Sequence, residues 1–316
     1  MQCSGGWYWL HRSTELNTGY TYRDTIQREH HGWTALDYYS SVYKHSSVEE
    51  WQQEFAGGNV TVAGSPILSE FIISTGMQLE WHRAPWVEPE VTATFEELYE
   101  DDSVLIVHKP EGLPVLPGGG FLQHTLLHLV REQHGEMLSP VHRLGRGTTG
   151  AIMFTKNKAA AEYYGTAMRD RTLQKIYLAM VQGVPEEREF TVDSPIGLVP
   201  YPPVGELHAS KPGGKSSTSH VTVLQRYPDR DCSLVQVEIP TGRPHQIRIH
   251  MGFAGHPLVG DPLYTAGGLP IAGGTAVPGD CGYFLHSWKL TFPLLQQPSQ
   301  TITAIAPPPA ALQNHG

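Results

Sequence analysis

The sequence predicts an α+β fold built around a largely antiparallel sheet, and three observations carry this prediction. Helix-like and strand-like segments follow one another in a mixed order, without the regular alternation of a parallel β/α fold. Glycine and proline are abundant, with 33 and 25 residues, which is typical of many turns and short strands. Several segments of strand length also alternate or run apolar, as antiparallel strands do.

Residues 22–85 are predicted to form a small first domain, after an extension over residues 1–21. The segment "VEEWQQEFAGGNVTVAGSPI" indicates a short helix, a glycine turn, a strand at residues 59–62 and a tight turn. The next segment, "MQLEWHRAPWVEPEVTATF", carries two prolines and several acids and is typical of a linker. We place the linker itself at residues 86–94.

A larger second domain is predicted over residues 95–306. "SVLIVHKPEG" indicates a strand that ends in a turn, and "LQHTLLHLVREQHG" a helix with one apolar face. "KAAAEYYGTAMRD" indicates a second helix. Further strands are predicted at "GAIMFTKN", "QKIYLAMVQG", "SHVTVLQRY", "CSLVQVEIP" and "HQIRIHM". The last residues, 307–316, are expected to be a frayed tail.

The net charge of −9 is unevenly distributed along the chain. Residues 1–100 hold 5 Lys/Arg and 14 Asp/Glu, whereas residues 101–316 hold 17 of each. Overall acidity argues against a general nucleic-acid binder. Residues 142–175 reverse this locally, with 7 Lys/Arg against 2 Asp/Glu, so a basic groove on an acidic body is a feasible RNA site.

Composition also indicates the compartment. The cysteines Cys3, Cys232 and Cys281 are too far apart for a disulfide framework or a zinc site, which favours a reducing cytoplasm. No apolar run approaches the roughly 18 residues of a membrane span, and the first residues are a poor match to a signal peptide. We therefore expect a cytoplasmic protein without a membrane partner, and we expect a monomer.

Two features of the sequence could be taken for a phosphate-binding loop or a metal site, but neither fits the required pattern. "KPGGKSS" lacks the glycine that a phosphate-binding loop requires, since that position is Ala209, so a flexible turn is the better interpretation. Among 17 histidines, His245 and His250 are five residues apart and would face opposite sides of a strand. No ligand set has metal-binding spacing, so no metal is expected.

The segment "PTGRPHQIRIHM" concentrates Arg243, His245, Gln246, Arg248 and His250 within eight residues. Burying so many donors without a partner is costly, so the cluster favours a binding site over its alternative, a set of surface charges on a strand. In a strand, Arg243 and His245 would share one face and Gln246 and Arg248 the other.

Six segments occur in the order "KPEGLPVLP", "PVHRLGRGTTG", "QKIYLAMVQG", "TGRPHQIRIHM", "GHPLVGDPLY" and "FLHSWKLTFP". Over about residues 95–294 this series resembles the RluA-type family of RNA pseudouridine synthases. Residues 22–85 resemble a diverged S4-like RNA-binding domain. The resemblance implies the pseudouridine-synthase fold and isomerisation of uridine in a structured RNA, rRNA or tRNA, without a metal or cofactor.

The catalytic loop departs from the family pattern HRLDRDTSG. The position of the family's catalytic aspartate is Gly145, and that of the second aspartate is Gly147. Glycine has no side chain to act as nucleophile or base. Two alternatives stay open: an isomerase that uses another acid, with Glu111 and Asp261 as candidates, or an RNA-binding module that kept the uridine pocket and lost the reaction.

Other family roles match residues of this chain. The resemblance implies that Tyr177 stacks on the base, and that Arg243 pairs with the catalytic carboxylate, which this chain lacks at position 145. Tyr177 could instead be an ordinary core residue of its strand. The predicted RNA contacts are His142, Arg143, Arg146, Lys175, Lys215, His245, Gln246 and Arg248, around a pocket between the basic loop and "GRPHQIR".

Overall fold

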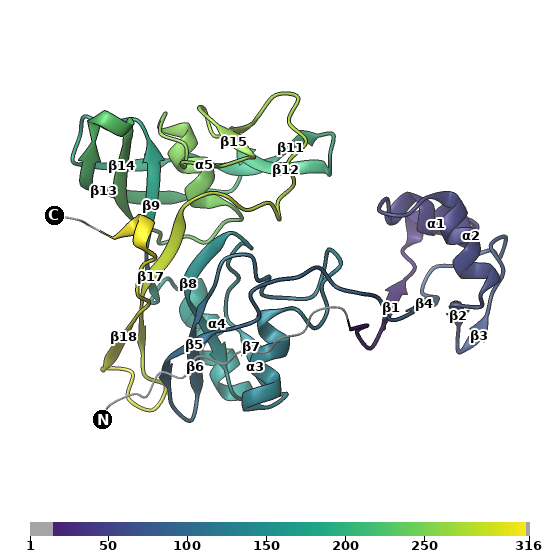
Figure 1. Ribbon diagram of the computed structural model, residues 1–316. Helices are drawn as coiled ribbons and strands as arrows, with labels where there is room; N and C mark the ends of the chain where they lie inside the picture. The colour runs from purple at the N-terminus through teal and green to yellow at the C-terminus, as the bar shows by residue number, and fades with distance from the viewer. Residues whose placement is uncertain (1–14, 314–316) are drawn as a thin grey trace. The chain divides into compact units, whose positions relative to one another are not determined.

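The computed structural model describes residues 15–313, which form two compact units, and the chain passes from the first to the second between Glu88 and Pro89 (Figure 1). The predicted extension 1–21 lies mostly outside the described residues, as do Cys3 and the start of the chain that was compared with a signal peptide. The two units have separate hydrophobic cores, so each has the packing expected of an independent domain.

The first unit is a small antiparallel sheet with two helices. The strands run in the order β1 (Tyr20–Thr25), β4 (Gln78–Arg83), β2 (Val60–Val62) and β3 (Ser65–Pro66), beside η1 (Arg28–His30), α1 (Ala35–Val42) and α2 (Val48–Ala56). Helix α2 begins at a capping box of Ser47 and Glu50, which satisfies exposed backbone N–H groups. The predicted helix and strand are present, but the start of the presumed linker is strand β4, where Leu79 and Trp81 are buried.

The second unit is built on a ten-stranded mixed sheet, in which β17 and β8 are parallel and every other pair is antiparallel. Its order is β10-β13-β14-β9-β17-β8-β6-β5, with β18 on β17 and β7 on β8. This confirms the predicted α+β class with a mostly antiparallel sheet. The strands are β5 (Glu96–Glu100), β6 (Val104–Lys109), β7 (Ser139–Pro140), β8 (Thr148–Thr155), β9 (Gln174–Gln182), β10 (Glu189–Asp193), β13 (Thr218–Tyr227), β14 (Cys232–Glu238), β17 (Leu285–Pro293) and β18 (Thr301–Ile305).

Three helices and two small hairpins complete this unit. They are α3 (Leu126–His134), α4 (Lys158–Arg169), α5 (Gln246–Phe253), the pair β11 (Ile196–Tyr201) and β12 (Gly205–Ser210), and the pair β15 (Tyr264–Thr265) and β16 (Leu269–Pro270), with short turns η2 (Pro228–Arg230) and η3 (Ala310–Leu312). The tail prediction is wrong, because Leu312 is buried against Leu178 and Leu234.

The predicted strand at "HQIRIHM" is also wrong, because these residues form helix α5. Residues 246–252 are all buried, so the helix has no polar face and no amphipathic period to reveal it. His245 precedes it in the left-handed conformation, with φ of 55°, and turns the chain into the helix. Arg243 and His245 therefore do not share the face of a strand.

Candidate active site

Adjacent strands bring distant segments to one place in the second unit. Thr148, at the start of β8, lies opposite Leu285 of β17, and β17 pairs on its other side with β9, where Tyr177 lies opposite Ser287. The loop that precedes Thr148 therefore ends close to Tyr177. This loop contains the glycines of "HRLGRGTTG".

The loop, β9 and the segment before α5 enclose a cavity with two adjoining chambers. The outer chamber has a volume of about 700 Å³ and the inner one about 90 Å³. Residues that line both chambers are Arg143, Leu144, Gly145, Tyr177, Ile239, Arg243 and His245. The structure thus brings together the three positions singled out for chemistry, Gly145, Tyr177 and Arg243.

The outer chamber adds His142 and Lys175 to this lining. Arg143 is exposed, and Arg243 is half-buried, with its Nε donating to the carbonyl of Ser216 at 3.3 Å. Burial lowers the pKa of His142 to about 3, so its imidazole is neutral at physiological pH. The chamber therefore presents a neutral ring beside cationic side chains.

Around Gly145, the inner chamber is shaped by Tyr283. A Cβ at Gly145 would lie 2.8 Å from the Tyr283 hydroxyl and 3.4 Å from Thr148 Oγ1, and a Cβ at Gly147 would lie 3.0 Å from the ring of Tyr283. The φ angle of neither glycine is in the left-handed region, so backbone strain does not require glycine there. The tyrosine, which sequence reasoning missed, occupies the space into which a side chain at 145 would extend.

Both tyrosines of the cavity are neutral phenols. Burial raises the pKa of Tyr177 to about 12, and it raises that of Tyr283 despite the opposing effect of Arg248, whose guanidinium carbon lies 4.1 Å from the ring centroid. Neutral phenols can donate or accept hydrogen bonds, but they are poor bases at neutral pH. Tyr177 is 6% exposed, so it belongs to the core as well as to the cavity wall.

Among the described residues, no Asp or Glu lines either chamber. Glu111 is exposed and lies outside the lining. The carboxylate of Asp261 accepts hydrogen bonds from Arg248 Nε at 2.7 Å and Nη2 at 2.6 Å, and from the backbone N–H groups of Leu263 and Tyr264. Neither predicted substitute for the missing acid is therefore positioned to act in the cavity.

Arg248 and Gln246 were predicted to contact RNA, but the structure buries both side chains. Arg248 is 2% exposed and is bound to Asp261. Gln246 is 3% exposed; its Oε1 accepts from Thr241 Oγ1 at 2.8 Å, and its Nε2 donates to the carbonyl of Thr218 at 2.8 Å. Both side chains form buried walls of the inner chamber and are not exposed to an RNA backbone, although Nη1 of Arg248 has no hydrogen-bond partner.

The other predicted RNA contacts differ in whether they line the cavity. His245 lines both chambers, but its Nδ1 is hydrogen-bonded to the hydroxyl of Tyr264 at 2.8 Å, and burial lowers its pKa to about 3. Arg146 packs its guanidinium over Phe121, at 5.3 Å from the ring centroid. Lys215 is exposed and lies outside both linings.

A buried lysine that sequence reasoning also missed holds the loop in place. Lys109 is fully buried at the end of β6, and its Nζ donates to the carbonyls of Pro110 and Leu113 at 2.8 Å and of Arg146 at 3.1 Å. The backbone N–H of Gly112 also donates to the Arg146 carbonyl. A lysine at the end of an apolar strand could have indicated a buried charge. Its partner, the Arg146 carbonyl, is 37 residues away, so the sequence pattern does not connect the two.

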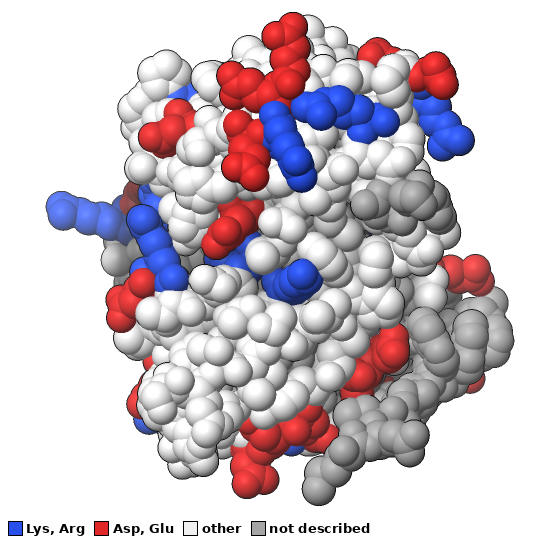
Figure 2. All heavy atoms as spheres, turned by 90° about the vertical axis from the view of Figure 1, so that its left-hand side faces the viewer, with Lys and Arg blue, Asp and Glu red and all other residues white. Residues whose placement is uncertain are grey.

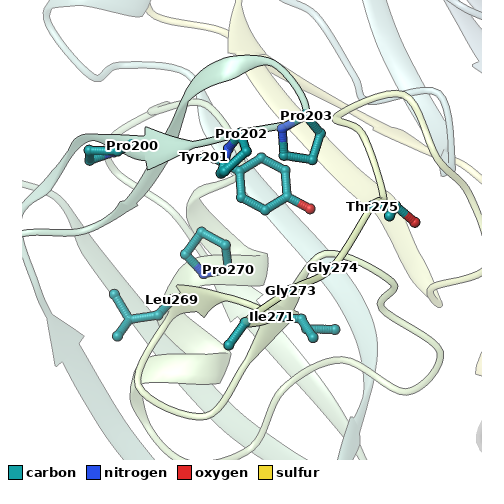
Figure 3. A pocket seen from close by; sticks show the side chains of 11 residues that line it. Pro200, Tyr201, Pro202, Pro203, Leu269, Pro270, Ile271, Gly273, Gly274 and Thr275 are labelled. Atoms are coloured by element: carbon teal, nitrogen blue, oxygen red, sulfur yellow. The ribbon is translucent and has the colours of Figure 1, made fainter.

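A separate cavity of about 710 Å³ lies between the tip of the β11–β12 hairpin and the segment after β16 (Figure 3). Four of its eleven lining residues are prolines, no charged side chain lines it, and the hydroxyl of Tyr201 donates to the carbonyl of Ala276. It therefore offers no group for acid–base chemistry. On the face of the molecule shown in Figure 2, acidic and basic side chains lie interspersed among uncharged ones.

Within residues 15–313, no group of three or more His, Cys, Asp or Glu side chains is arranged to hold a metal ion. None of the helices described is long and apolar enough to cross a membrane.

Solved structures with this architecture define the fold. Human RNA pseudouridylate synthase domain containing 1 aligns with a TM-score of 0.55 at 24% identity, over 72% of this chain and 89% of that one. Human RNA pseudouridylate synthase domain containing 4 aligns with a TM-score of 0.51 at 24% identity, over 68% of this chain and 89% of that one. The second unit therefore has the pseudouridine-synthase fold.

Sequence comparison then gives the family. The RNA pseudouridylate synthase profile matches residues 103–252. RNA pseudouridine synthase 5 of Arabidopsis thaliana is 39% identical, over 95% of each chain, and an uncharacterized RNA pseudouridine synthase of Synechocystis is 39% identical, over 88% of this chain and 94% of its own. The chain belongs to the RNA pseudouridylate synthase family.

Proposed function

We propose that the protein converts uridine to pseudouridine in RNA, with the target nucleoside held in the two-chamber cavity. The observation that carries this proposal is the convergence of Gly145, Tyr177 and Arg243 on one cavity, in a chain of this family. The reaction breaks the bond from C1′ of the ribose to N1 of uracil and forms a bond from C1′ to C5. The C5 proton is lost and N1 gains one, so no cofactor is consumed.

The cavity can supply binding energy for this step. Extruding a base from a stacked RNA costs a few kcal/mol, and stacking on an aromatic ring returns about 1–3 kcal/mol. Tyr177 is the ring at the junction of the two chambers. Arg243 and Arg143 carry guanidinium groups suited to phosphate or carbonyl oxygens of the RNA.

A second candidate function is binding of a uridine without conversion. It is favoured by the lining of the described cavity, which contains no carboxylate, while His142 and His245 are neutral and the two tyrosines are protonated. A group that attacks C1′ or removes the C5 proton needs a basic or nucleophilic atom. A binding protein does not.

The finer assignment is also proposed. The series of motifs supports membership of the RluA-type branch, in a glycine form defined by "HRLGRGT". We assign rRNA or tRNA as the substrate, the cytoplasm as the location, a monomer as the working form, and a diverged S4-like domain over residues 22–85. The basic segment 142–175 and the widely spaced cysteines support the substrate class and the location.

The test is to incubate the full-length protein with total RNA from a strain that lacks the gene, and to map pseudouridine. The synthase proposal requires new pseudouridines at defined sites, and their loss with Tyr177→Ala. Lys211→Ala is the matched control and should leave the pattern unchanged, because Lys211 is exposed and lies outside both chambers. If no pseudouridine forms while specific RNA binding persists, the binding-only function replaces the synthase.

A further inference from the structure

Three Lys or Arg side chains are buried among the described residues, and two of them are hydrogen-bonded to other parts of the chain, although Nη1 of Arg248 has no partner. Lys109 donates to three backbone carbonyls, and Arg248 binds both carboxylate oxygens of Asp261. Such partners are expected, because removing a charge from water is costly unless it is paired or hydrogen-bonded.

Lys175 is the exception. It is 5% exposed, and its ammonium has no hydrogen-bond or ion-pair partner within residues 15–313; Nζ is not among the fully buried atoms that lack a partner, which agrees with its place in the lining of the outer chamber. The register of the sheet gives one reason, because Glu238 lies opposite Ile176 and shares the face of that residue, away from Lys175. Burial lowers the pKa of Lys175, and no carboxylate offsets this effect.

The ammonium lies at the outer chamber. Lys175 and Tyr177 are two residues apart on β9, so they share one face of the sheet, and both line this chamber together with Arg243. A Cβ at Gly242 would lie 3.5 Å from Lys175 Nζ, so the missing side chain leaves the approach to the ammonium uncovered. The chamber holds cationic groups and, among its lining residues, no acid.

We infer that Lys175 and Arg243 form an anion-binding subsite that takes a phosphate group of the nucleotide in the cavity. This inference rests on the proposed function in RNA. Phosphate fits because its several oxygens can accept from an ammonium and a guanidinium at once, and charge-assisted hydrogen bonds of this kind are strong. The subsite explains why the fold keeps a buried cation without a protein partner.

The direct test compares binding of uridine with binding of uridine 5′- and 3′-monophosphate to the full-length protein, by calorimetry. A charged hydrogen bond predicts that at least one monophosphate binds about 10- to 100-fold more tightly than uridine. Lys175→Gln should remove most of this preference, and Lys175→Arg should retain part of it. Lys158→Gln is the control, because Lys158 is exposed and outside the cavity, and it should change nothing.

Thermal unfolding gives a second readout. Lys175→Met should raise the Tm of the protein without ligand, since it removes a buried charge that has no partner and keeps the length of the side chain. Inorganic phosphate should raise the Tm of the wild type and leave that of Lys175→Met unchanged.

Several outcomes overturn the subsite: equal affinity for uridine and both monophosphates, an undiminished preference in Lys175→Gln, or no binding of any of them together with no effect of phosphate on Tm. These results are separate from the test of conversion. If the protein prefers a monophosphate through Lys175 but forms no pseudouridine, the subsite is supported and the synthase proposal is rejected. If it forms pseudouridine but shows no such preference, the synthase proposal is supported and the subsite is rejected.

Discussion

Arg243 and Arg248 lie five residues apart, one before the start of helix α5 and one in its first turn, and the structure uses them in opposite ways. Arg248 is buried and bound through two hydrogen bonds to Asp261. Arg243 faces a cavity and, among the described residues, meets no carboxylate. One arginine is part of the scaffold, and the other is available to a ligand.

The difference arises from a single turn. His245 adopts the left-handed conformation, and the helix that starts after it directs residues 246–252 into the core. An extended strand would have presented Arg248 on a surface. The comparison therefore shows that the density of donors in this segment identifies the site, while the local conformation decides which donors are free.

The largest effect is expected from breaking the scaffold pair. Asp261→Asn should lower the free energy of unfolding by about 3–5 kcal/mol, because it leaves the buried Arg248 without its counter-charge. Arg243→Gln should change it by about 0.5 kcal/mol or less, since this half-buried side chain makes one hydrogen bond, to the Ser216 carbonyl. Urea denaturation measures both, and equal losses would contradict the division between scaffold and ligand site.

The second largest effect on stability is expected from Gly145→Asp, which supplies the carboxylate that Arg243 lacks in the cavity. Gly145→Asp should cost about 1–3 kcal/mol of stability, because its Cβ would lie 2.8 Å from the Tyr283 hydroxyl. Adding Tyr283→Phe removes that hydroxyl and should recover much of the loss, a coupling of about 0.5–3 kcal/mol in a double-mutant cycle. Pseudouridine formation should rise in the double variant, and strictly additive stabilities would show that Tyr283 does not restrict position 145.

Much of the fold was predictable because it depends on local patterns. The strand at Val104–Lys109 and the helix at Leu126–His134 carry clear apolar patterns and turn signals, and both are where the sequence places them. Helix α5 was missed because it is buried all round, and β4 because prolines shortly after it favoured a linker. These errors come from tertiary burial, which a periodicity in one segment does not report.

The site was predictable only in part. Gly145, Tyr177 and Arg243 line one cavity, as the motif series implied, although their chemical roles stay predictions. Tyr283 and Lys109 act on the loop through contacts across 136 to 138 and 37 residues. No pattern in the sequence connects such distant positions, so the origin of the small residues at 145 and 147 could not be derived from it.

A smaller effect concerns the basic loop. Arg143→Ala should reduce the dependence of log K on log salt by about 0.7–0.9, the value of one phosphate contact, because Arg143 is exposed at the outer chamber. Arg146→Ala should reduce it less, since its guanidinium packs on Phe121 and its Nε is buried. Titrations of structured RNA at several salt concentrations give both slopes, and identical decreases would show that Arg146 also reaches the RNA.

The smallest effect is expected from removing the first unit. Residues 13–88 hold 10 Asp/Glu and 4 Lys/Arg, so at neutral pH this unit should repel the RNA backbone. Its core includes Trp51, Tyr39 and Leu79, and the buried residues of the second unit form separate clusters, so deleting the first unit removes none of them. A protein that starts at Pro89 should therefore keep its fold and bind structured RNA with equal or slightly higher affinity. Circular dichroism confirms the fold, and filter binding at low salt measures the affinity. A large loss of affinity in a folded truncation would show that the acidic unit contacts RNA itself, as an S4-like domain with a local basic surface would.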